Sequence, residues 1–598
     1  MGKRGGIRQR LGLDGAAQRP GEASSSADAG GLAPGRNVRQ RTGAAASDQY
    51  PLNHSLRRDW GKGKISARQV QDYASGAERQ GADGLQSIAA AGSGGKHPQN
   101  LHRSLVNIFG HPKGAPELTW CRIPTKRGHT LHPIMLPHKW FAALYEQDSD
   151  LFRRAVQGPD GACAAFWTMM AGTPFVASHP TLARQEMHCT IPIGFYGDAG
   201  AYSHQDSLYV FTWNSLLGSG PTMSKRFLMT CIKKSDLCPG TFDAMFRIFC
   251  WSFNCLIGGK WPASDWLGRP AAGEAEGRMV GDLAGGQRAC LCQVRGDWEF
   301  YCSIFSFPKW NTSANMCWMC DASANGPLSF SNCSADAPWR ATRRTHESYI
   351  AAIRARGGAV PCLFEHAQGL RLESIMIDVL HTSDQGFASH VAGNIIQECI
   401  QARAFDPGNA DANIAALNKK LDGWYKANRV TSTIKGKLSK ERVKTSNGWP
   451  KLKAKAAGTR HLAPFVLLLA QQHLDRRRIA LCQLLVDFYE MLATQGMFLD
   501  DAAKAAMPNL GRRMCGIFAQ LSADALGRGV KAWKMTPKVH LMLHLCEWQA
   551  PSVGNPRFFW VYADEDMVGS MIEVAESCHA STMAATAMVK WLIFSLNV

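Results

Sequence analysis

The chain has 598 residues, of which 45% are hydrophobic and 19% are charged, as in ordinary globular proteins. Its formal net charge of +19 favours a polyanionic partner, either nucleic acid or an anionic membrane. No uncharged apolar run reaches the roughly 18 residues that span a bilayer, so we expect no membrane partner. The 19 cysteines, an odd number without a secretory signal, favour reduced intracellular thiols, a few of them bound to metal, over a disulfide framework.

The first hundred residues differ in composition from the remainder of the chain. Residues 1–100 are rich in glycine, alanine, serine, glutamine and arginine, and they contain few large apolar side chains. Such a segment buries too little surface to offset its chain entropy, so we expect a disordered arm. Its first 68 residues hold 13 lysines and arginines against 5 acids, which is typical of a nuclear-import or DNA-contact segment.

The region 101–190 is mixed, with a helical apolar rhythm over 138–157. The first part of a sheet follows over 191–335. We expect strands at 191–198, 206–217 and 225–234, a buried helix at 241–259 with Thr241 as N-cap, and a fourth strand over 288–305 that Asp297 interrupts. This β-β-β-α-β order is the beginning of a ribonuclease-H-like α/β fold.

The remainder of the chain is helical in pattern. Residues 336–535 predict a large, mainly α-helical insertion into the α/β core. Residues 536–598 close the chain, and 564–597 predict one long final helix.

Three acidic positions suit a shared metal site in such a fold. The first and fourth strands would lie side by side, so Asp198 and Asp297 would be neighbours, and Glu565 at the start of the final helix would join them. Three converging carboxylates can hold two divalent ions roughly 3.5–4 Å apart, and Mg²⁺ or Mn²⁺ prefers such oxygen ligands. Each acid alone is more often a turn or capping residue, so the coincidence of all three carries the prediction.

Two pairs of softer ligands are separated by more than 200 residues. Cys317 and Cys320 form a C-x-x-C pair, and His540 and His544 would share one face of a helix. Two thiolates and two imidazoles make a tetrahedral structural Zn²⁺ site, which would hold the insertion against the sheet core. Cys333 and His346 offer a local alternative to the histidine pair.

The ordered spacing of these residues resembles DDE transposases with a helical insertion. It is similar to the CACTA/Mirage/Chapaev group and to the Transib-derived recombination-activating recombinase core, over residues 190–590. Those proteins place a C-x-x-C about twenty residues after the second acid and a histidine pair some twenty residues before the catalytic Glu. Here Cys317 follows Asp297 by 20 residues, and His544 precedes Glu565 by 21. The histidines are spaced H-x-x-x-H, where relatives can have one residue more.

Two ambiguities remain in that match. The acids Asp564 and Asp566 flank Glu565, so the third acid is uncertain by one position. In addition, Asp378 and His381 form a D-x-x-H motif within 375–390 that also resembles a transposase motif. Asp378 is therefore the alternative second acid, although the C-x-x-C would then precede it.

A strongly basic stretch lies inside the predicted insertion. Residues 419–460 hold 13 lysines and arginines against 2 acids, with tryptophan and tyrosine interleaved. Neutralisation of phosphates and stacking of aromatic rings would suit DNA, although a solvated loop is an equally good interpretation. The candidate DNA-binding residues are Lys419, Lys420, Lys426, Arg429, Lys435, Lys437, Lys440, Arg442, Lys444, Lys451, Lys453 and Lys455.

The resemblance implies a nuclear DNA transposase that hydrolyses a phosphodiester at a transposon end and joins the freed 3′-hydroxyl to target DNA. It implies two Mg²⁺ or Mn²⁺ ions on Asp198, Asp297 and Glu565, a structural Zn²⁺ and a homodimer. Two alternatives stay open: a catalytically inactive, domesticated DNA-binding protein, and a ribonuclease-H-like nuclease without strand transfer.

Overall fold

The computed structural model describes residues 51–596 apart from 93–97, 183–186, 271–280 and 313. The first half of the predicted basic arm, residues 1–50, lies outside the described residues. Within the described part of the chain, no helix is both long and apolar enough to cross a membrane.

A four-stranded sheet forms the centre of the α/β part. Its strands are β3 (Thr190–Ala201), β4 (Ser207–Ser215), β5 (Phe227–Lys233) and β6 (Arg288–Arg295), in the order β5-β4-β3-β6. β3 pairs antiparallel with β4, and β4 pairs antiparallel with β5, whereas β3 and β6 run parallel. The three successive strands form where the sequence predicts them, and the α/β class is confirmed.

Helix α11 (Thr241–Gly258) links β5 to β6 and packs on the sheet through aromatic side chains. Phe246 and Phe249 lie against Phe195 and Phe211 of β3 and β4, with ring centroids 5.7–6.2 Å apart. The helix ends at Gly259 with a left-handed φ of 63°, as predicted. Its N-cap, however, is Gly240, because the Thr241 hydroxyl donates to the carbonyl of Pro124 instead.

The predicted fourth strand over 288–305 is wrong in its second half. β6 ends at Arg295, and Asp297 is the N-cap of a new helix, α12 (Trp298–Phe305). The Asp297 carboxylate accepts a hydrogen bond from the amide of Phe300 at 2.6 Å. Because an aspartate in this position satisfies a free amide of the first turn, the residue that interrupts the apolar run also starts a helix.

The predicted single long final helix is also wrong. The chain forms α23 (Tyr562–Glu576) and α24 (Met583–Ser595), separated by a break at 577–582. α23 contacts β3 and β4, and α24 contacts β5. Trp591 of α24 is fully buried and meets Trp140 edge-on at 6.0 Å.

The predicted disorder of residues 1–100 is wrong for 51–92, which form helices with a small core of their own. Trp60, Val70 and Ile88 are completely buried in this core, and Ile593 of α24 joins it. The Ser66 side chain and Gln69 form a capping box at the start of the second helix, which composition alone conceals. These helices are α2 (Pro51–Gly61), α3 (Ala67–Arg79), α4 (Gln86–Ala89) and α5 (Pro98–Phe109).

A hairpin and several short helices connect this part to the sheet. The hairpin strands are β1 (Thr119–Thr125) and β2 (Gly128–Ile134), which the sequence analysis did not anticipate. The helices predicted over 138–157 are α6 (Pro137–Gln147), α7 (Ser149–Phe152) and the π-helical η2 (Arg153–Gln157). The remaining short helices before β6 are α8 (Ala162–Met170), α9 (Pro174–Ser178), η4 (Met187–Cys189), α10 (Thr222–Lys225), η5 (Lys234–Asp236) and η7 (Leu283–Gly286).

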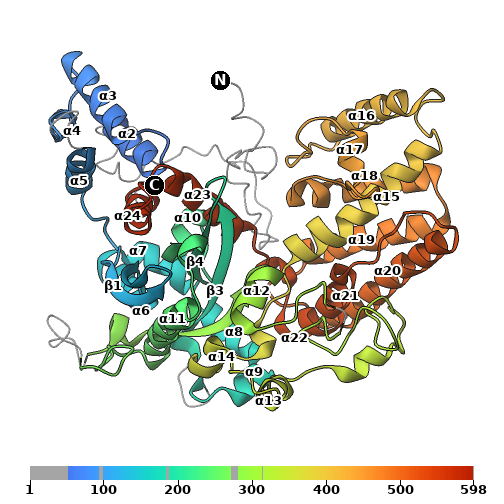
Figure 1. Ribbon diagram of the computed structural model, residues 1–598, viewed down its shortest axis with the longest axis horizontal. Helices are drawn as coiled ribbons and strands as arrows, with labels where there is room; N and C mark the ends of the chain where they lie inside the picture. Colours follow the sequence, from blue (N-terminus) through green and yellow to red (C-terminus); the bar gives the residue numbers. More distant parts are fainter. Residues whose placement is uncertain (1–50, 93–97, 183–186, 271–280, 313, 597–598) are drawn as a thin grey trace, which may run out of the picture.

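The segment 336–535 is mainly helical, as predicted, and its long helices lie to the right of the sheet in Figure 1. The long helices are α15 (Ala388–Gln401), α16 (Ala410–Ala427), α18 (Ala456–His473), α19 (Arg476–Thr494) and α20 (Asp501–Gly527). Shorter ones are η8 (Pro338–Thr342), α13 (His346–Ala355), α14 (Cys362–His366), η9 (Leu372–Ser374), η10 (Leu380–Phe387) and α17 (Lys440–Val443). The return to α23 runs through α21 (Pro537–His544), η11 (Leu545–Gln549), α22 (Ala550–Val553) and η12 (Pro556–Phe558).

Candidate active site and metal centre

The parallel pairing of β3 with β6 determines where the first two acids lie. Tyr196 is opposite Arg295 in the register, so Asp198 and Asp297 each follow this pair by two residues. The backbone segments after β3 Tyr196 and β6 Arg295 approach closely: a Cβ atom at Gly296 would lie 2.9 Å from the carbonyl oxygen of Gly197. Each acid is therefore preceded by a glycine, and this repeated Gly-Asp is a signal that the sequence analysis did not use.

Glu565 reaches Asp198 from the first turn of α23. The Tyr196 hydroxyl lies 3.1 Å from Oε1 of Glu565 and 3.3 Å from Oδ2 of Asp198. The other Asp198 oxygen accepts the amide of Ala199 at 2.7 Å. Two carboxylates that are 367 residues apart in sequence therefore converge on one phenol.

Burial and mutual repulsion set the protonation of this carboxylate pair. Burial raises the pKa of Asp198 well above its ordinary value, and the charges of Glu565 and Asp297 raise it further. Burial likewise raises the pKa of Glu565. Close carboxylates resist ionising together unless a cation neutralises them, so the pair favours either a shared proton or a bound cation.

His381 supplies a positive charge at the edge of the carboxylates. Its Nδ1 lies 2.9 Å from Asp378 Oδ2, and its Nε2 lies 3.8 Å from Glu565 Oε1. Burial alone would lower the pKa of His381, but the hydrogen bond and charge of Asp378, with the charges of Glu565 and Asp297, raise it to about 9. The imidazolium is therefore a fixed partner of this cluster.

Asp378, the alternative second acid, lies beside the cluster without replacing Asp297. Its oxygens accept the amides of Leu380, His381 and Val561 at 2.8–3.1 Å. With those contacts and the His381 ring, Asp378 has the geometry of an orienting group. The structure thus brings both candidate motifs together, which the sequence analysis treated as alternatives.

The three consecutive acids of α23 have different surroundings. Asp564 is fully buried and pairs with Arg226 at 2.6 Å and Arg295 at 3.2 Å. Asp566 is exposed, and only Glu565 faces Asp198. A helix turns by about 100° per residue, so neighbouring positions must face different partners.

The cysteine and histidine pairs form a second, fully buried cluster. Cys317, Cys320, His540 and His544 place one ligand atom each within 4.8 Å of one another. Nε2 of His540 lies 3.2 Å from Cys320 Sγ, and Nε2 of His544 lies 3.4 Å from it. In a tetrahedron with metal–ligand bonds of 2.0–2.3 Å, the ligand atoms are about 3.6 Å apart, so the four residues fit a structural metal ion.

Several features prepare this cluster for a metal ion. Burial lowers the pKa of His544 to about 4, so its ring is neutral and free to ligate. Although burial alone would raise it, contacts with Cys320 and the histidines hold the pKa of Cys317 well below its ordinary value. Trp548 stacks on His544 at 4.0 Å, and Trp339 meets His540 edge-on at 4.5 Å. These rings close the cluster to solvent.

The local alternative to the histidine pair does not form a ligand set. His346 uses Nδ1 to accept the amide of Leu372, whereas Cys333 is buried near Arg340 and Glu547. Among the described residues, only Cys317, Cys320, His540 and His544 form a group of metal-ligand spacing.

The basic stretch covers the end of α16, the loop around α17 and the approach to α18. Eight of its twelve candidate side chains are exposed, whereas Lys420, Arg442, Lys444 and Lys451 are half-buried. Several are held internally. Lys440 pairs with Asp411 at 2.8 Å, Lys420 donates to the side-chain oxygen of Gln472, and the Arg442 guanidinium donates to the carbonyl of Lys435.

The end of this stretch leads toward the carboxylates. The amide of Leu452 donates to the carbonyl of Ser389 at 2.8 Å, which places the segment beside the start of α15, directly after η10. Lys534 and Lys538 lie near Lys451 but outside the basic stretch 419–460, so the charge of that stretch does not identify them. Burial and the charge of Lys451 lower the pKa of Lys538 to about 8, against the opposing charges of Asp297 and Asp378.

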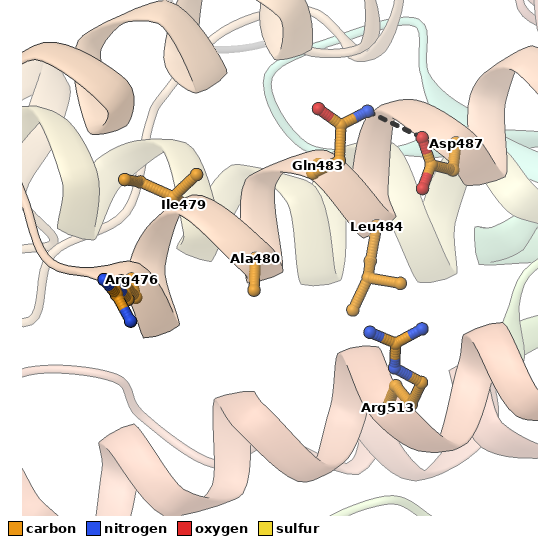
Figure 2. A pocket seen from close by; sticks show the side chains of 7 residues that line it. All are labelled: Arg476, Ile479, Ala480, Gln483, Leu484, Asp487 and Arg513. Carbon is orange, nitrogen blue, oxygen red and sulfur yellow. Dashed lines mark hydrogen bonds between the residues drawn. The ribbon is translucent and has the colours of Figure 1, made fainter.

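A groove of about 350 Å³ between α19 and α20 is separate from both clusters (Figure 2). The guanidinium of Arg513 lies beside Leu484, Arg476 lies at the start of α19, and Gln483 donates to Asp487. None of the candidate site residues lines it.

Comparison of the chain with protein-family models and with curated proteins gives no match.

Proposed function

We propose that this protein is a DDE-type, transposase-like enzyme that cleaves and joins DNA phosphodiesters, with Asp198, Asp297 and Glu565 as ligands of two Mg²⁺ or Mn²⁺ ions. The observation that carries the proposal is the convergence of Asp198 and Glu565 on the Tyr196 hydroxyl, next to the end of β6, which Asp297 follows by two residues. If the three acids were only capping residues, there would be no reason for Glu565, on a helix more than 350 residues further along the chain, to lie beside Asp198.

The sheet order supports the same proposal. The β5-β4-β3-β6 order, with the edge strand β6 parallel to β3, is the order expected of the first four strands of a ribonuclease-H-like core. Functional groups gather where adjacent parallel strands end side by side, and Asp198 and Asp297 occupy that position.

The carboxylates would act as ligands in their ionised form. Bound ions would activate a water molecule or a 3′-hydroxyl and would stabilise the leaving oxygen of the phosphodiester. Asp198 and Glu565 hold their oxygens toward one another, while Tyr196 fixes both with its hydroxyl. Asp378 holds the His381 ring so that Nε2 points to the carboxylate edge, where it can donate a proton to a phosphoryl oxygen.

A polyanionic substrate fits the cations beside the cluster. Lys451, Lys534 and Lys538 lie close enough together that all three charges lower the pKa of the buried His390, after burial itself. None of the three forms a salt bridge within the described residues, and Lys534 sits 5.8 Å from the Trp449 ring centroid. Unpaired like charges near one another favour binding of a phosphate backbone.

Zinc is the ion that we propose for the cluster of Cys317, Cys320, His540 and His544. Two thiolates and two imidazoles in a closed, tetrahedral set are typical of structural zinc. The ion would tie the loop after α12 to α21 and thereby fix the return of the chain toward Glu565.

The first test is nicking of supercoiled plasmid DNA with Mg²⁺ or Mn²⁺. Wild-type protein should nick the plasmid, and Asp198→Asn and Glu565→Gln should abolish nicking with DNA binding unchanged. Asp566→Asn is the matched control, because this neighbouring acid is exposed and should leave nicking intact. Nicking that persists in Asp198→Asn at the wild-type rate would show that the assignment is wrong.

A second assay separates transposition chemistry from simple hydrolysis. A labelled oligonucleotide with a free 3′-hydroxyl should become joined to the plasmid in a metal-dependent reaction. Nicking without joining would instead favour a nuclease, and DNA binding with neither reaction would favour an inactive DNA-binding protein.

A further inference from the structure

A buried carboxylate outside the candidate active site joins three distant parts of the chain. Asp384 of η10 is completely buried. Its Oδ1 accepts the hydroxyl of Tyr489 at 2.5 Å, and its Oδ2 accepts the hydroxyl of Tyr562. Tyr489 lies in α19 of the helical insertion, whereas Tyr562 is the first residue of α23. One side chain therefore connects the insertion to the helix that carries Glu565.

The segment 378–387, which includes η10, contacts the start of α23 at a second point. The amide of Val561 donates to Asp378 at 3.0 Å, so residues 561 and 562 are bound to one acid just before η10 and to another within it. His381 lies between these two acids. Glu565 follows Tyr562 by three residues, which is nearly one helical turn. The positions of Glu565 and His381 thus depend on one another through this segment.

The η10 segment is π-helical over residues 380–387. Such segments are rare and are found most often at functional sites, because their looser turns displace side chains from ordinary helical positions. Within it, His381 contacts Asp378, whereas Asp384 contacts Tyr489 and Tyr562. That observation favours a specific task for the segment over simple packing.

A cation from the basic stretch completes the connection. The guanidinium of Arg460, the last basic residue of that stretch, lies 4.7 Å from the Tyr562 ring centroid and 4.4 Å from that of Trp560. Its Nη1 atom is buried and has no hydrogen-bond partner among the described residues. Any shift of the basic stretch would therefore act on Tyr562 directly.

We propose that Asp384 is a positioning residue that sets Glu565 against Asp198 and couples this placement to the helical insertion. The inference rests on the proposed function, since Glu565 must be a metal ligand for its placement to matter. Under this inference, binding of nucleic acid to the basic stretch would change the placement of Glu565 through the contacts of Arg460, Tyr562 and Asp384.

The test is Mn²⁺ affinity at the carboxylates, measured by electron paramagnetic resonance below the unfolding temperature, together with kcat and KM for plasmid nicking. Asp384→Ala should weaken Mn²⁺ binding at least tenfold and lower kcat, with KM for DNA within twofold of wild type. Asp384→Asn, which keeps the shape and one acceptor oxygen, should recover much of both. Asp487→Ala is the matched control, since Asp487 lies in the same insertion helix as Tyr489 and accepts a hydrogen bond from Gln483 of that helix.

Tyr562→Phe keeps the inference testable if Asp384→Ala fails to fold, because it removes one hydroxyl and should lower Mn²⁺ affinity in the same direction. An Asp384→Ala protein, or failing that a Tyr562→Phe protein, with wild-type Mn²⁺ affinity and kcat would overturn this inference alone. Wild-type protein that neither binds Mn²⁺ nor nicks DNA would overturn the proposed function and this inference together.

Discussion

The cysteine–histidine cluster and the carboxylate cluster each join segments more than 200 residues apart in the sequence, yet they differ in burial and in charge. The cysteine–histidine cluster is buried at all four positions and is closed by Trp339 and Trp548. In the carboxylate cluster, Glu565 is partly exposed and faces the charged ring of His381. A closed set with every position filled by protein suits a structural ion, whereas an open set leaves positions for a substrate. The contrast separates the part that holds the chain together from the part that we propose reacts.

Removal of the metal from the cysteine–histidine cluster should have the largest effect on stability. Binding of zinc to such ligand sets is worth on the order of 10 kcal/mol, so its loss should unfold the connection between the loop after α12 and α21. Chelation and His544→Ala should each release one zinc per chain and lower the midpoint of thermal unfolding. Zinc content by mass spectrometry and calorimetry would check this, and zinc retained in His544→Ala would contradict it.

Loss of a carboxylate from the proposed active site should abolish nicking with little loss of stability. The adjacent residues Asp564 and Glu565 of α23 allow this to be compared with loss of a structural carboxylate. Asp564→Asn leaves Arg226 and Arg295 buried without their partner, which should cost about 3–5 kcal/mol of stability. Glu565→Gln should cost little stability and abolish nicking. Denaturant unfolding and plasmid nicking on both proteins would check this, and equal loss of stability in the two would remove the distinction.

A cation beside the carboxylates should affect binding without affecting the chemistry of the acids. Lys538→Ala should weaken DNA binding and reduce the slope of log affinity against log salt by about 1. Lys504→Ala, in the α20 helix of the insertion, is the control and should leave the slope unchanged. Fluorescence anisotropy over a range of salt concentrations would measure both.

A further prediction is a pH dependence of stability that passes through Asp384. Burial raises the pKa of Asp384 to about 7, although Arg460 and the hydroxyls of Tyr489 and Tyr562 lower it. A carboxyl whose pKa is raised by folding stabilises the protein at low pH, and that contribution is lost as pH rises from about 4 to about 7. Asp384→Asn should therefore lose less stability than wild type over this range, by at most about 4 kcal/mol. Parallel pH profiles of the two proteins would contradict the assignment.

The sequence predicted the parts of the fold that depend on local pattern. The strands β3, β4 and β5 and the helix α11 alternate or repeat their apolar residues clearly enough to be located. The errors occur where a single residue changes the structure, as at Asp297, which ends an apolar run and caps a helix. The helices at 51–92 were missed because small and polar residues dominate this segment, and they hid a few large buried side chains such as Trp60.

Part of the site was predictable from spacing and strand order. Spacing suggested the cysteine–histidine set, and the expected strand order placed Asp198 and Asp297 side by side with Glu565 near them. It did not reveal that Asp378 and His381 join the same cluster, since that depends on how η10 packs against α23. Nor did it show that Asp564 is engaged by two buried arginines, because those partners are 338 and 269 residues away.

An Mn²⁺ titration followed by electron paramagnetic resonance is the decisive measurement for the proposal that the carboxylate cluster binds divalent metal ions. Zinc-loaded wild-type protein should bind two Mn²⁺ ions per chain, and Asp198→Asn should lose them while it retains its zinc. No Mn²⁺ binding by wild type, or equal binding by Asp198→Asn, would contradict the account.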